Sequence, residues 1–378
     1  MSAPVNAADA PLLLFEHSTD SGHVLAEARL NAEATLNALS LAMIDILRPA
    51  LDRWQQDERV AAVVLTGSGE RAFSAGGDIQ ALYRAMVKNH EAGEVVDDYP
   101  FRFFEQEYRL DYRLHTYPKP LVSIGHGVVM GGGLGVFSGA RWRVVTETTR
   151  IAMPEVTIGL FPDAGATWLL QGMPRHVATF AAMTGVHLNG SDALATGIGT
   201  HAVAARERHG LLDGLRRLAW RGRAEDDAAA VQAHLDALPA VELPPSRVVG
   251  IPEELSPDGA LLDAVTRVRA LAGRDEWIDK GIETMNRGCP TSVGIVVRQL
   301  QRLPGLKIGD CFRLEMVVAT HCAHERDFAE GVRALIIDKD NRPRWRYPDL
   351  ESLPVEHVDA HFVPPWPKNP LEDLEEGA

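Results

Sequence analysis

The amino-acid sequence predicts an α/β core with largely parallel strands, followed by a helical C-terminal region. In the first 205 residues, short apolar runs alternate with amphipathic stretches in the order β-β-α-β-α-β-α-β, a pattern typical of a sheet covered by helices. Glycine-rich turns follow several of the apolar runs. After Ala204 the chain becomes charged and its apolar residues recur at helical spacing, which predicts helices rather than further strands.

Two strands and a helix are predicted at the start of this core. Residues 12–16 and 24–30 form the predicted strand pair, joined by a polar turn that contains glycine. Ser40 is a suitable N-cap, because its hydroxyl can accept a hydrogen bond from a backbone N–H of the first helical turn. The helix that it begins extends to Gln56, with Leu and Ile side chains on one face.

Three further strands are predicted at residues 60–66, 121–125 and 142–146, each a short apolar run. A helix is predicted between the first two of these strands, at residues 99–115. The predicted domains are a core at 12–205, a helical insertion and proline-rich connector at 206–258, a helical region at 259–350 and an extended acidic tail at 351–378.

The charge and composition argue against several classes of protein. The formal net charge is −14, with 52 acidic and 38 basic residues, whereas nucleic-acid binders carry clusters of Lys and Arg. An anionic ligand stays open, because it needs only a local basic patch. No run of about 18 apolar residues occurs, so no membrane span is expected. The start lacks the pattern of a signal peptide and the three cysteines form no disulfide framework, so we expect a cytoplasmic protein.

Familiar catalytic motifs are missing from the sequence. The glycine-rich segments lack the GK[ST] of a phosphate-binding loop and the GxGxxG of a dinucleotide site. Neither a GxSxG nucleophile elbow nor an HExxH zinc motif occurs. His321, Cys322 and His324 form the one metal-like grouping, expected in the middle of a helix. Such a group without further ligands is more typical of a structural or surface position, so we predict no metal site.

Two glycine-rich turns each follow a predicted strand and lead into a helical pattern. They are residues 73–79 (FSAGGDI) and 128–135 (VVMGGGLG). Glycine lets the backbone approach a ligand closely, and N–H groups at a helix start point outward as donors. Two such turns can each aim one N–H at a single oxygen and so form an oxyanion hole. The alternative is a pair of tight strand-to-helix turns that bind nothing.

Two carboxylates, Glu155 and Asp163, stand in the apolar stretch MPEVTIGLFPDAG, and each follows a proline. Partial desolvation among Ile, Leu and Phe raises the pKa of a carboxyl group, which suits acid–base chemistry. The alternative is structural, because Asp163 can cap the helix expected after it and Glu155 can form a salt bridge.

Together these segments resemble the crotonase (enoyl-CoA hydratase/isomerase) superfamily. The resemblance rests on LNALS, AFSAGGDI, KPLVSIGHGVVMGGGLG and AMPEVTIGLFPDAGATWLL, in the family's order and spacing. It covers roughly residues 12–205, and it implies a core of repeated β-β-α units, a helical C-terminal region and an acyl-CoA substrate. Within the superfamily the chain is more similar to the 3-hydroxyisobutyryl-CoA hydrolases, because DFAEGVRALIIDKDNRPRWR extends the match to about residue 350.

The resemblance implies roles for individual residues. The two backbone N–H groups that hold the thioester oxygen fall on Gly77 and Gly132. The catalytic carboxyl pair of the hydrolases falls on Glu155 and Asp163, and a substrate-contacting glutamate falls on Glu107. The remaining positions expected to contact substrate lie in the first glycine-rich turn and are Ala75, Gly76 and Ile79.

One departure from the hydratases favours hydrolysis. Hydratases carry a second glutamate where this chain has Gly135, and a glycine where it has Asp163. The resemblance therefore implies hydrolysis of a short β-hydroxyacyl-CoA, 3-hydroxyisobutyryl-CoA in valine breakdown, with Glu155 as nucleophile or general base. The alternatives are an enoyl-CoA hydratase or isomerase and a non-catalytic CoA-binding protein. No cofactor is expected beyond the coenzyme A of the substrate, and assembly into a homo-oligomer stays open.

Overall fold

A computed structural model describes residues 3–375 of the chain. Its contacts divide the chain into two units, each assembled from three separate segments. Unit 1 comprises residues 1–77, 113–151 and 188–246, and unit 2 comprises residues 78–112, 152–187 and 247–378. The linear boundaries predicted at 205, 258 and 350 follow composition rather than contacts, and they stay a prediction.

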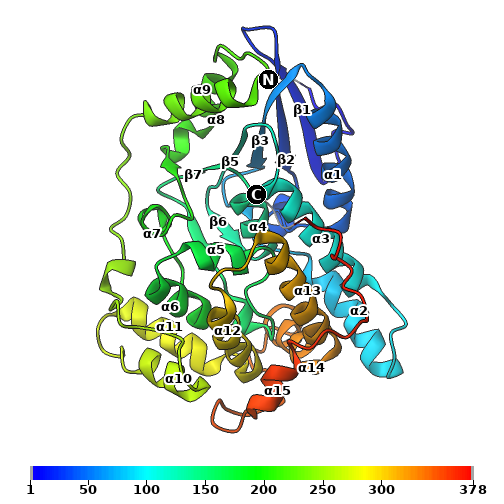
Figure 1. Ribbon diagram of the computed structural model, residues 1–378, viewed down its shortest axis with the longest axis vertical. Helices are drawn as coiled ribbons and strands as arrows, with labels where there is room; N and C mark the ends of the chain where they lie inside the picture. Colours follow the sequence, from blue (N-terminus) through cyan, green and yellow to red (C-terminus); the bar gives the residue numbers. More distant parts are fainter. Residues whose placement is uncertain (1–2, 376–378) are drawn as a thin grey trace. The chain divides into compact units, whose positions relative to one another are not determined.

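Unit 1 contains a six-stranded sheet with the strand order β1-β2-β3-β5-β7-β9 (Figure 1). Strands β1 and β2 are antiparallel, with Leu12 opposite Leu30, and every later pair of neighbours in this sheet is parallel. The prediction of a largely parallel sheet is therefore confirmed. The strands are β1 (Leu12–Ser18), β2 (Val24–Leu30), β3 (Val60–Gly67), β5 (Leu121–Ile124), β7 (Trp142–Val145) and β9 (His201–Ala202).

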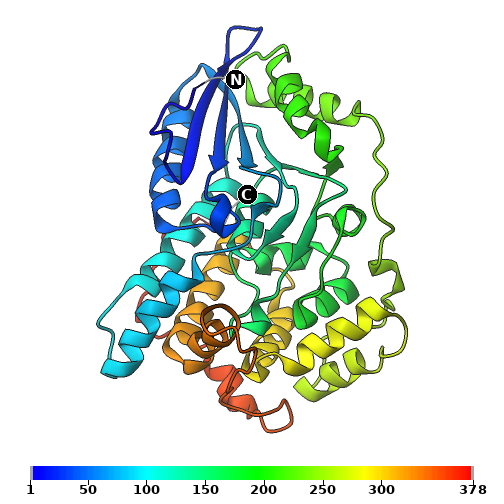
Figure 2. The same ribbon diagram turned by 180° about the vertical axis from the view of Figure 1, so that it is seen from behind.

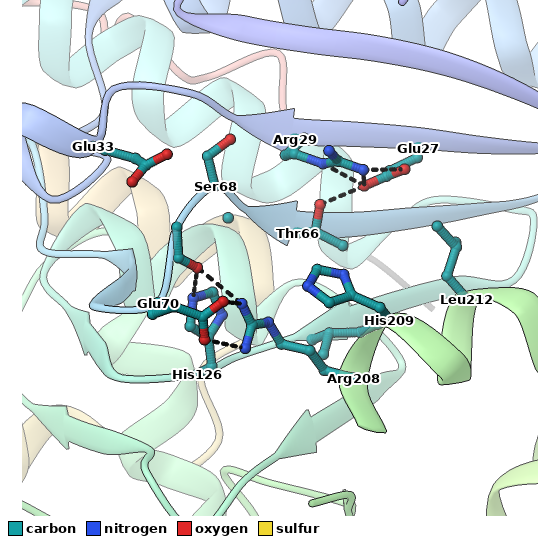
Figure 3. Close-up of a pocket in the computed structure, with 13 residues that line it drawn as sticks. Glu27, Arg29, Glu33, Thr66, Ser68, Glu70, His126, Arg208, His209 and Leu212 are labelled. Atoms are coloured by element: carbon teal, nitrogen blue, oxygen red, sulfur yellow. Dashed lines mark hydrogen bonds and ion pairs between the residues drawn. The ribbon is translucent and has the colours of Figure 1, made fainter. Parts of the chain in front are cut away.

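Helices of unit 1 bury the apolar side chains of this sheet. Helix α1 (Leu41–Gln56) begins where the sequence predicts it, and the Ser40 hydroxyl accepts a hydrogen bond from the Met43 N–H at 3.3 Å. Figure 2 shows α1 beside the blue strands β1 and β2. Helices α8 (Arg208–Arg216) and α9 (Ala224–Asp236) pack against β2, β3, β5 and β7. The segment predicted as an insertion thus supplies part of the core of unit 1.

A second sheet of unit 1 has three strands, which the sequence patterns do not predict. They are β4 (Ala72–Ser74), β6 (Val128–Met130) and β8 (Arg150–Ala152), in the order β4-β6-β8. The first residues of each glycine-rich turn therefore belong to a strand. Helix α4 (Gly132–Ser138) follows the second turn, as predicted. Strands of three residues are too short to show an alternating pattern in the sequence.

Unit 2 is mainly helical, as the apolar spacing after residue 259 predicts. Helix α12 lies against α5, α6, α10 and α15. A Cβ atom at Gly294 of α12 would lie 2.7 Å from the Val358 side chain of α15, so only glycine permits this approach. The helices are α2 (Ile79–Ala92), α3 (Tyr99–His115), α5 (Ala166–Gly172), α6 (Arg175–Thr184), α10 (Leu261–Arg269), α11 (Glu276–Arg287), α12 (Pro290–Arg302), α13 (Ile308–His324), α14 (Arg326–Val332) and α15 (Val355–Ala360).

The C-terminal segment differs from the predicted extended tail. It contains α15, and beyond this helix Leu371 is completely buried. The Arg109 guanidinium forms an ion pair with Asp373 at 2.8 Å, and the Asn369 side chain donates to the Arg313 carbonyl oxygen at 3.0 Å. An apolar anchor and paired polar groups therefore hold this acidic segment against unit 2 up to the last described residue.

The three cysteines, Cys289, Cys311 and Cys322, are buried free thiols, which agrees with a chain that has no disulfide framework. Among residues 3–375, no helix is both long enough and apolar enough to cross a membrane.

Candidate active site

The two glycine-rich turns lie close together in unit 1. Strands β4 and β6, which lead into them, are parallel neighbours. A Cβ atom at Gly76 would lie 3.5 Å from the Met130 carbonyl oxygen and 4.0 Å from the Gly132 nitrogen. Gly76 also has a φ of 118°, which residues with a side chain rarely adopt. The residue type at this position is therefore explained by backbone geometry.

The two N–H groups assigned to the thioester oxygen, those of Gly77 and Gly132, belong to these turns. In the described part of the chain, neither the Gly77 nor the Gly132 N–H is used in a backbone hydrogen bond. Ala75 and Gly77 are half-buried, and Gly132 is the buried first residue of α4. The two donors are thus available, and their role as an oxyanion hole stays a prediction. Ile79, predicted to contact substrate, is the first residue of α2 in unit 2.

Glu155 is a buried and incompletely paired carboxyl group of unit 2. It begins a short 3₁₀ helix, Glu155–Thr157, directly after Pro154. Its side chain is 4 % exposed, and its Oε2 atom has no hydrogen-bond partner among the described residues. Burial raises the pKa of Glu155 well above its ordinary value, and the Asp163 carboxylate raises it further. No cation of the described residues pairs with Glu155, so the alternative of a salt bridge is wrong.

Asp163 is held by a tyrosine hydroxyl. The Tyr108 O–H of helix α3 donates to Asp163 Oδ2 at 2.7 Å, and both side chains are buried. Burial raises the pKa of Asp163 to about 6, and the hydrogen bond from Tyr108 opposes that rise. Tyr108 is a reliable donor because burial and the neighbouring carboxylates raise the pKa of its phenol well above 10.

The structural alternative for Asp163, a helix N-cap, is wrong. Helix α5 begins at Ala166, and its N-cap position is occupied by Gly165, which has no side chain, rather than by Asp163. The carboxylate that accepts from this helix end belongs to Glu315 of α13, which receives the N–H groups of Gly165 and Thr167 at 2.8 Å each. The Asp163 carboxylate is therefore free of a capping role.

Two further carboxyl groups from helix α3 complete a buried acidic cluster in unit 2. Glu107 and Asp111 lie one helical turn apart and are 2 % and 0 % exposed. Glu107 Oε1 and both carboxylate oxygens of Asp111 have no hydrogen-bond partner among the described residues. Burial raises the pKa of both groups well above the ordinary values, and the pKa of Glu107 is raised further by Asp163, Glu315 and Glu155. Burial and mutual repulsion therefore favour the neutral, protonated form of these carboxyl groups over the ionised form.

The residues singled out in the sequence gather in two places, one in each unit. Glu107, Glu155 and Asp163, each singled out in the sequence, influence one another electrostatically in unit 2. Gly76 and Gly132 meet in unit 1. No group of three or more His, Cys, Asp or Glu in the described residues is arranged to hold a metal ion.

The grouping of His321, Cys322 and His324 lies elsewhere in its helix than predicted. His321 and His324 lie in the last turn of α13 rather than in its middle. The His321 Nε2 atom lies 2.8 Å from the Val363 carbonyl oxygen, and the His324 ring packs against Phe101. Both side chains thus have structural contacts.

Sequence reasoning missed Tyr108, Asp111 and Glu315. A usable signal for the two acids exists, because each occupies a position in an apolar helical stripe where Leu, Phe or Val is expected. Asp111 lies one turn after Glu107 within FFEQEYRLDYRLH, and Glu315 follows Phe312 in CFRLEMVV. No comparable signal marks Tyr108, because tyrosine is common in ordinary cores.

Comparison with known proteins identifies the family and the fold of the chain. The sequence profile described as Enoyl-CoA hydratase/isomerase matches residues 25–362. The chain belongs to this family. A crystal structure of an enoyl-CoA hydratase from Rhodobacter sphaeroides has a TM-score of 0.79 at 32% identity, covering 93% of this chain and 97% of that one. A carnitinyl-CoA dehydratase from Mycobacterium thermoresistibile has a TM-score of 0.80 at 30% identity, covering 95% and 99%. The predicted family fold is confirmed.

Several proteins with sequences similar to this chain are named 3-hydroxyisobutyryl-CoA hydrolase. The mitochondrial 3-hydroxyisobutyryl-CoA hydrolase of Danio rerio is 33% identical over 93% of this chain and 89% of its own length. The proteins of the same name from Gallus gallus and Homo sapiens are 32% and 31% identical, over 89% and 93% of this chain and 85% and 91% of their own lengths. The named relatives are mitochondrial, and the cytoplasmic location of this chain stays a prediction.

Proposed function

We propose that this chain hydrolyses the thioester of a short β-hydroxyacyl-CoA, and that 3-hydroxyisobutyryl-CoA is its substrate, as in valine breakdown. The observation that carries the proposal is the state of Asp163. Its carboxylate accepts a hydrogen bond from Tyr108 and caps no helix, so it is available to a polar group of a substrate. Relatives named 3-hydroxyisobutyryl-CoA hydrolase support the same conclusion.

The proposed chemistry begins at the thioester carbonyl carbon. Glu155 either attacks this carbon directly or removes a proton from the water that attacks it. Its raised pKa makes the ionised carboxylate a stronger base and nucleophile than an ordinary glutamate. Collapse of the tetrahedral intermediate breaks the C–S bond, and the electron pair leaves with sulfur as CoA thiolate. If an anhydride with Glu155 forms, a water molecule then cleaves it and restores the carboxylate.

The thioester oxygen becomes negatively charged in this step. In the proposal it accepts hydrogen bonds from the Gly77 and Gly132 N–H groups, which have no backbone acceptor in the described residues. One such donor contributes about 3–4 kcal/mol to the transition state. Asp163 is proposed to orient the substrate β-hydroxyl or the attacking water, and Glu107 to contact the acyl group. No metal or separate cofactor takes part in the proposal, and the partner is the acyl-CoA itself.

Hydration of an enoyl-CoA is the competing activity. Adding water across a C=C bond needs one group for the water and another for the α-carbon. The position expected to hold the second glutamate of a hydratase is Gly135, a buried residue of α4 that has no titratable group. This departure supports hydrolysis rather than hydration.

Release of free thiol from a panel of acyl-CoA esters tests the proposal. We expect rapid release from 3-hydroxyisobutyryl-CoA and 3-hydroxypropionyl-CoA, and slow release from isobutyryl-CoA, because unpaired polar groups reject a substrate that lacks the hydroxyl. Loss of the enoyl absorbance of crotonyl-CoA without thiol release would instead identify a hydratase. Acyl-CoA binding without turnover of any ester would identify a non-catalytic binding protein.

A further inference from the structure

The turn that carries Asp163 is held from two helices of unit 2. Glu315 of α13 is completely buried, and its two carboxylate oxygens accept the N–H groups of Gly165 and Thr167. Gln299 of α12 is also buried, and its side-chain amide donates to the Pro162 carbonyl oxygen at 2.7 Å and to the Thr167 hydroxyl oxygen at 2.8 Å. We call Glu315 and Gln299 the turn clamp.

The conformation of this turn explains why it needs an external support. Ala164 has a φ of 53° and Gly165 a φ of 84°, so two consecutive residues are left-handed. Such a conformation costs free energy at a residue with a side chain, and it persists only where the surroundings impose it. The two hydrogen bonds to Glu315 fix Gly165, the second residue of the left-handed pair, and Thr167, two residues after it. The bond from Gln299 to Pro162 fixes the residue directly before Asp163.

Glu315 also occupies the N–H groups that the Asp163 carboxylate could otherwise accept. The first N–H groups of a helix lack acceptors within the helix and attract a nearby carboxylate. Asp163 is such a carboxylate by sequence, because it precedes α5 by three residues. Glu315 occupies the N–H groups of Gly165 and Thr167. The Asp163 side chain is thereby left to Tyr108, to which it is bonded at 2.7 Å.

We propose that Glu315, assisted by Gln299, is a positioning residue that keeps Asp163 away from the end of α5 and directed at the β-hydroxyl of the substrate. The inference rests on the proposed function for its consequence in selectivity, but the position of Asp163 can be measured without any reaction. Removing Glu315 would free two N–H groups, and Asp163 would turn toward them and lose its bond to Tyr108.

The experiment compares Glu315→Gln with a matched control, Asp192→Asn. Asp192 is likewise a buried carboxylate at a helix start, accepting from the Asn189 N–H at 3.0 Å and from the Ser246 hydroxyl at 2.8 Å, but it belongs to α7 (Gly190–Thr196) in unit 1. We expect both variants to lower the melting temperature. Only Glu315→Gln should reduce the preference for 3-hydroxyisobutyryl-CoA over isobutyryl-CoA in kcat/KM, by at least about tenfold, while KM changes less than kcat.

A second measurement needs no substrate. The chain has six tyrosines, so the ¹³Cζ NMR signal of Tyr108 can be assigned by its loss in Tyr108→Phe. In Glu315→Gln this signal should move to its position in Asp163→Asn, and it should stay unchanged in Asp192→Asn. If Glu315→Gln does not fold, Gln299→Met removes the donor to Pro162 and Thr167 with little change of volume and should shift the same signal in the same direction.

An unchanged Tyr108 signal in a folded clamp variant would overturn the inference, because Asp163 would then keep its place without the clamp. An unchanged substrate preference with a lowered melting temperature would also overturn it and leave Glu315 a helix cap only. If the wild-type protein releases no thiol from any ester, the proposed function fails, and the NMR signal alone decides the positioning role.

Discussion

Replacing Tyr108 with phenylalanine removes one hydroxyl from the buried acidic cluster and leaves the ring in place. The hydroxyl donates to Asp163 Oδ2 at 2.7 Å, and it favours the ionised form of that carboxyl group. Hydrogen bonds to charged groups contribute about 1.5–3 kcal/mol, and one pKa unit corresponds to about 1.4 kcal/mol. The apparent pKa of Asp163, about 6 in the intact protein, should therefore rise by about one to two units in Tyr108→Phe.

The pH dependence of thiol release measures this change. If ionised Asp163 is required, kcat/KM of Tyr108→Phe should be about five- to fiftyfold below wild type near pH 6 and should recover at high pH. Tyr112→Phe is the matched control, because Tyr112 lies on the same helix and its hydroxyl donates to the Glu375 carbonyl oxygen rather than to a carboxylate. An acid limb of the profile that coincides in the wild type and Tyr108→Phe would refute the reasoning, since it would show that Tyr108 does not control the titration.

Three further predictions concern other parts of the site. Glu155→Gln should lower thiol release by about 10³ or more while acyl-CoA binding survives, and a variant that keeps a tenth of wild-type turnover would make Glu155 structural. Gly132→Pro should abolish turnover more completely than Gly132→Ala, because proline removes the N–H yet fits the first position of a helix. Equal activity of the two variants, with circular dichroism showing that both are folded, would exclude the Gly132 N–H as a donor. Asp111→Asn should raise the free energy of unfolding at pH 7, measured by urea unfolding, by about 1.4 kcal/mol for each unit by which burial raises the pKa of Asp111. Because burial raises the pKa of Asp111, the wild-type protein loses stability as pH rises above the pKa of an aspartate in the unfolded chain. The difference in stability between Asp111→Asn and wild type should therefore vanish near about pH 4.

Local signals predicted the frame of unit 1 well. The N-cap of α1 was predictable because the Ser40 hydroxyl and the N–H that donates a hydrogen bond to it lie within one helical turn. Apolar runs such as that of β3 indicate buried strands by composition alone. The pairing of β4 with β6 could not be predicted in the same way, since each strand has only three residues. The approach of Gly76 to Gly132 depends on that pairing.

The role of Asp163 shows where local signals end. From the sequence, catalysis and helix capping were equally compatible with an aspartate ahead of a helix. Tyr108, 55 residues earlier in the chain, binds the Asp163 carboxylate, and Glu315, 150 residues after Gly165, accepts the Gly165 N–H. These contacts argue against the capping alternative, and the catalytic role of Asp163 stays a prediction. Neither distant residue carries a recognisable motif, because a buried tyrosine or glutamate acquires its role only from the side chains packed around it.

The alternation of segments between the two units has a consequence for biosynthesis. Six segments make up the units, so the growing chain passes from one unit to the other five times. All parts of unit 1 exist once residue 246 has been made, whereas residues 78–112 and 152–187 must wait for the C-terminal helices. Phe104 packs against Phe328 and Phe180 against Trp277 in the finished protein, so both lack these partners until the C-terminal segment has been made. A nonsense mutation between residues 181 and 247 would produce a chain that contains these side chains without the helices that cover them, and it would make the product a target for chaperones and proteases.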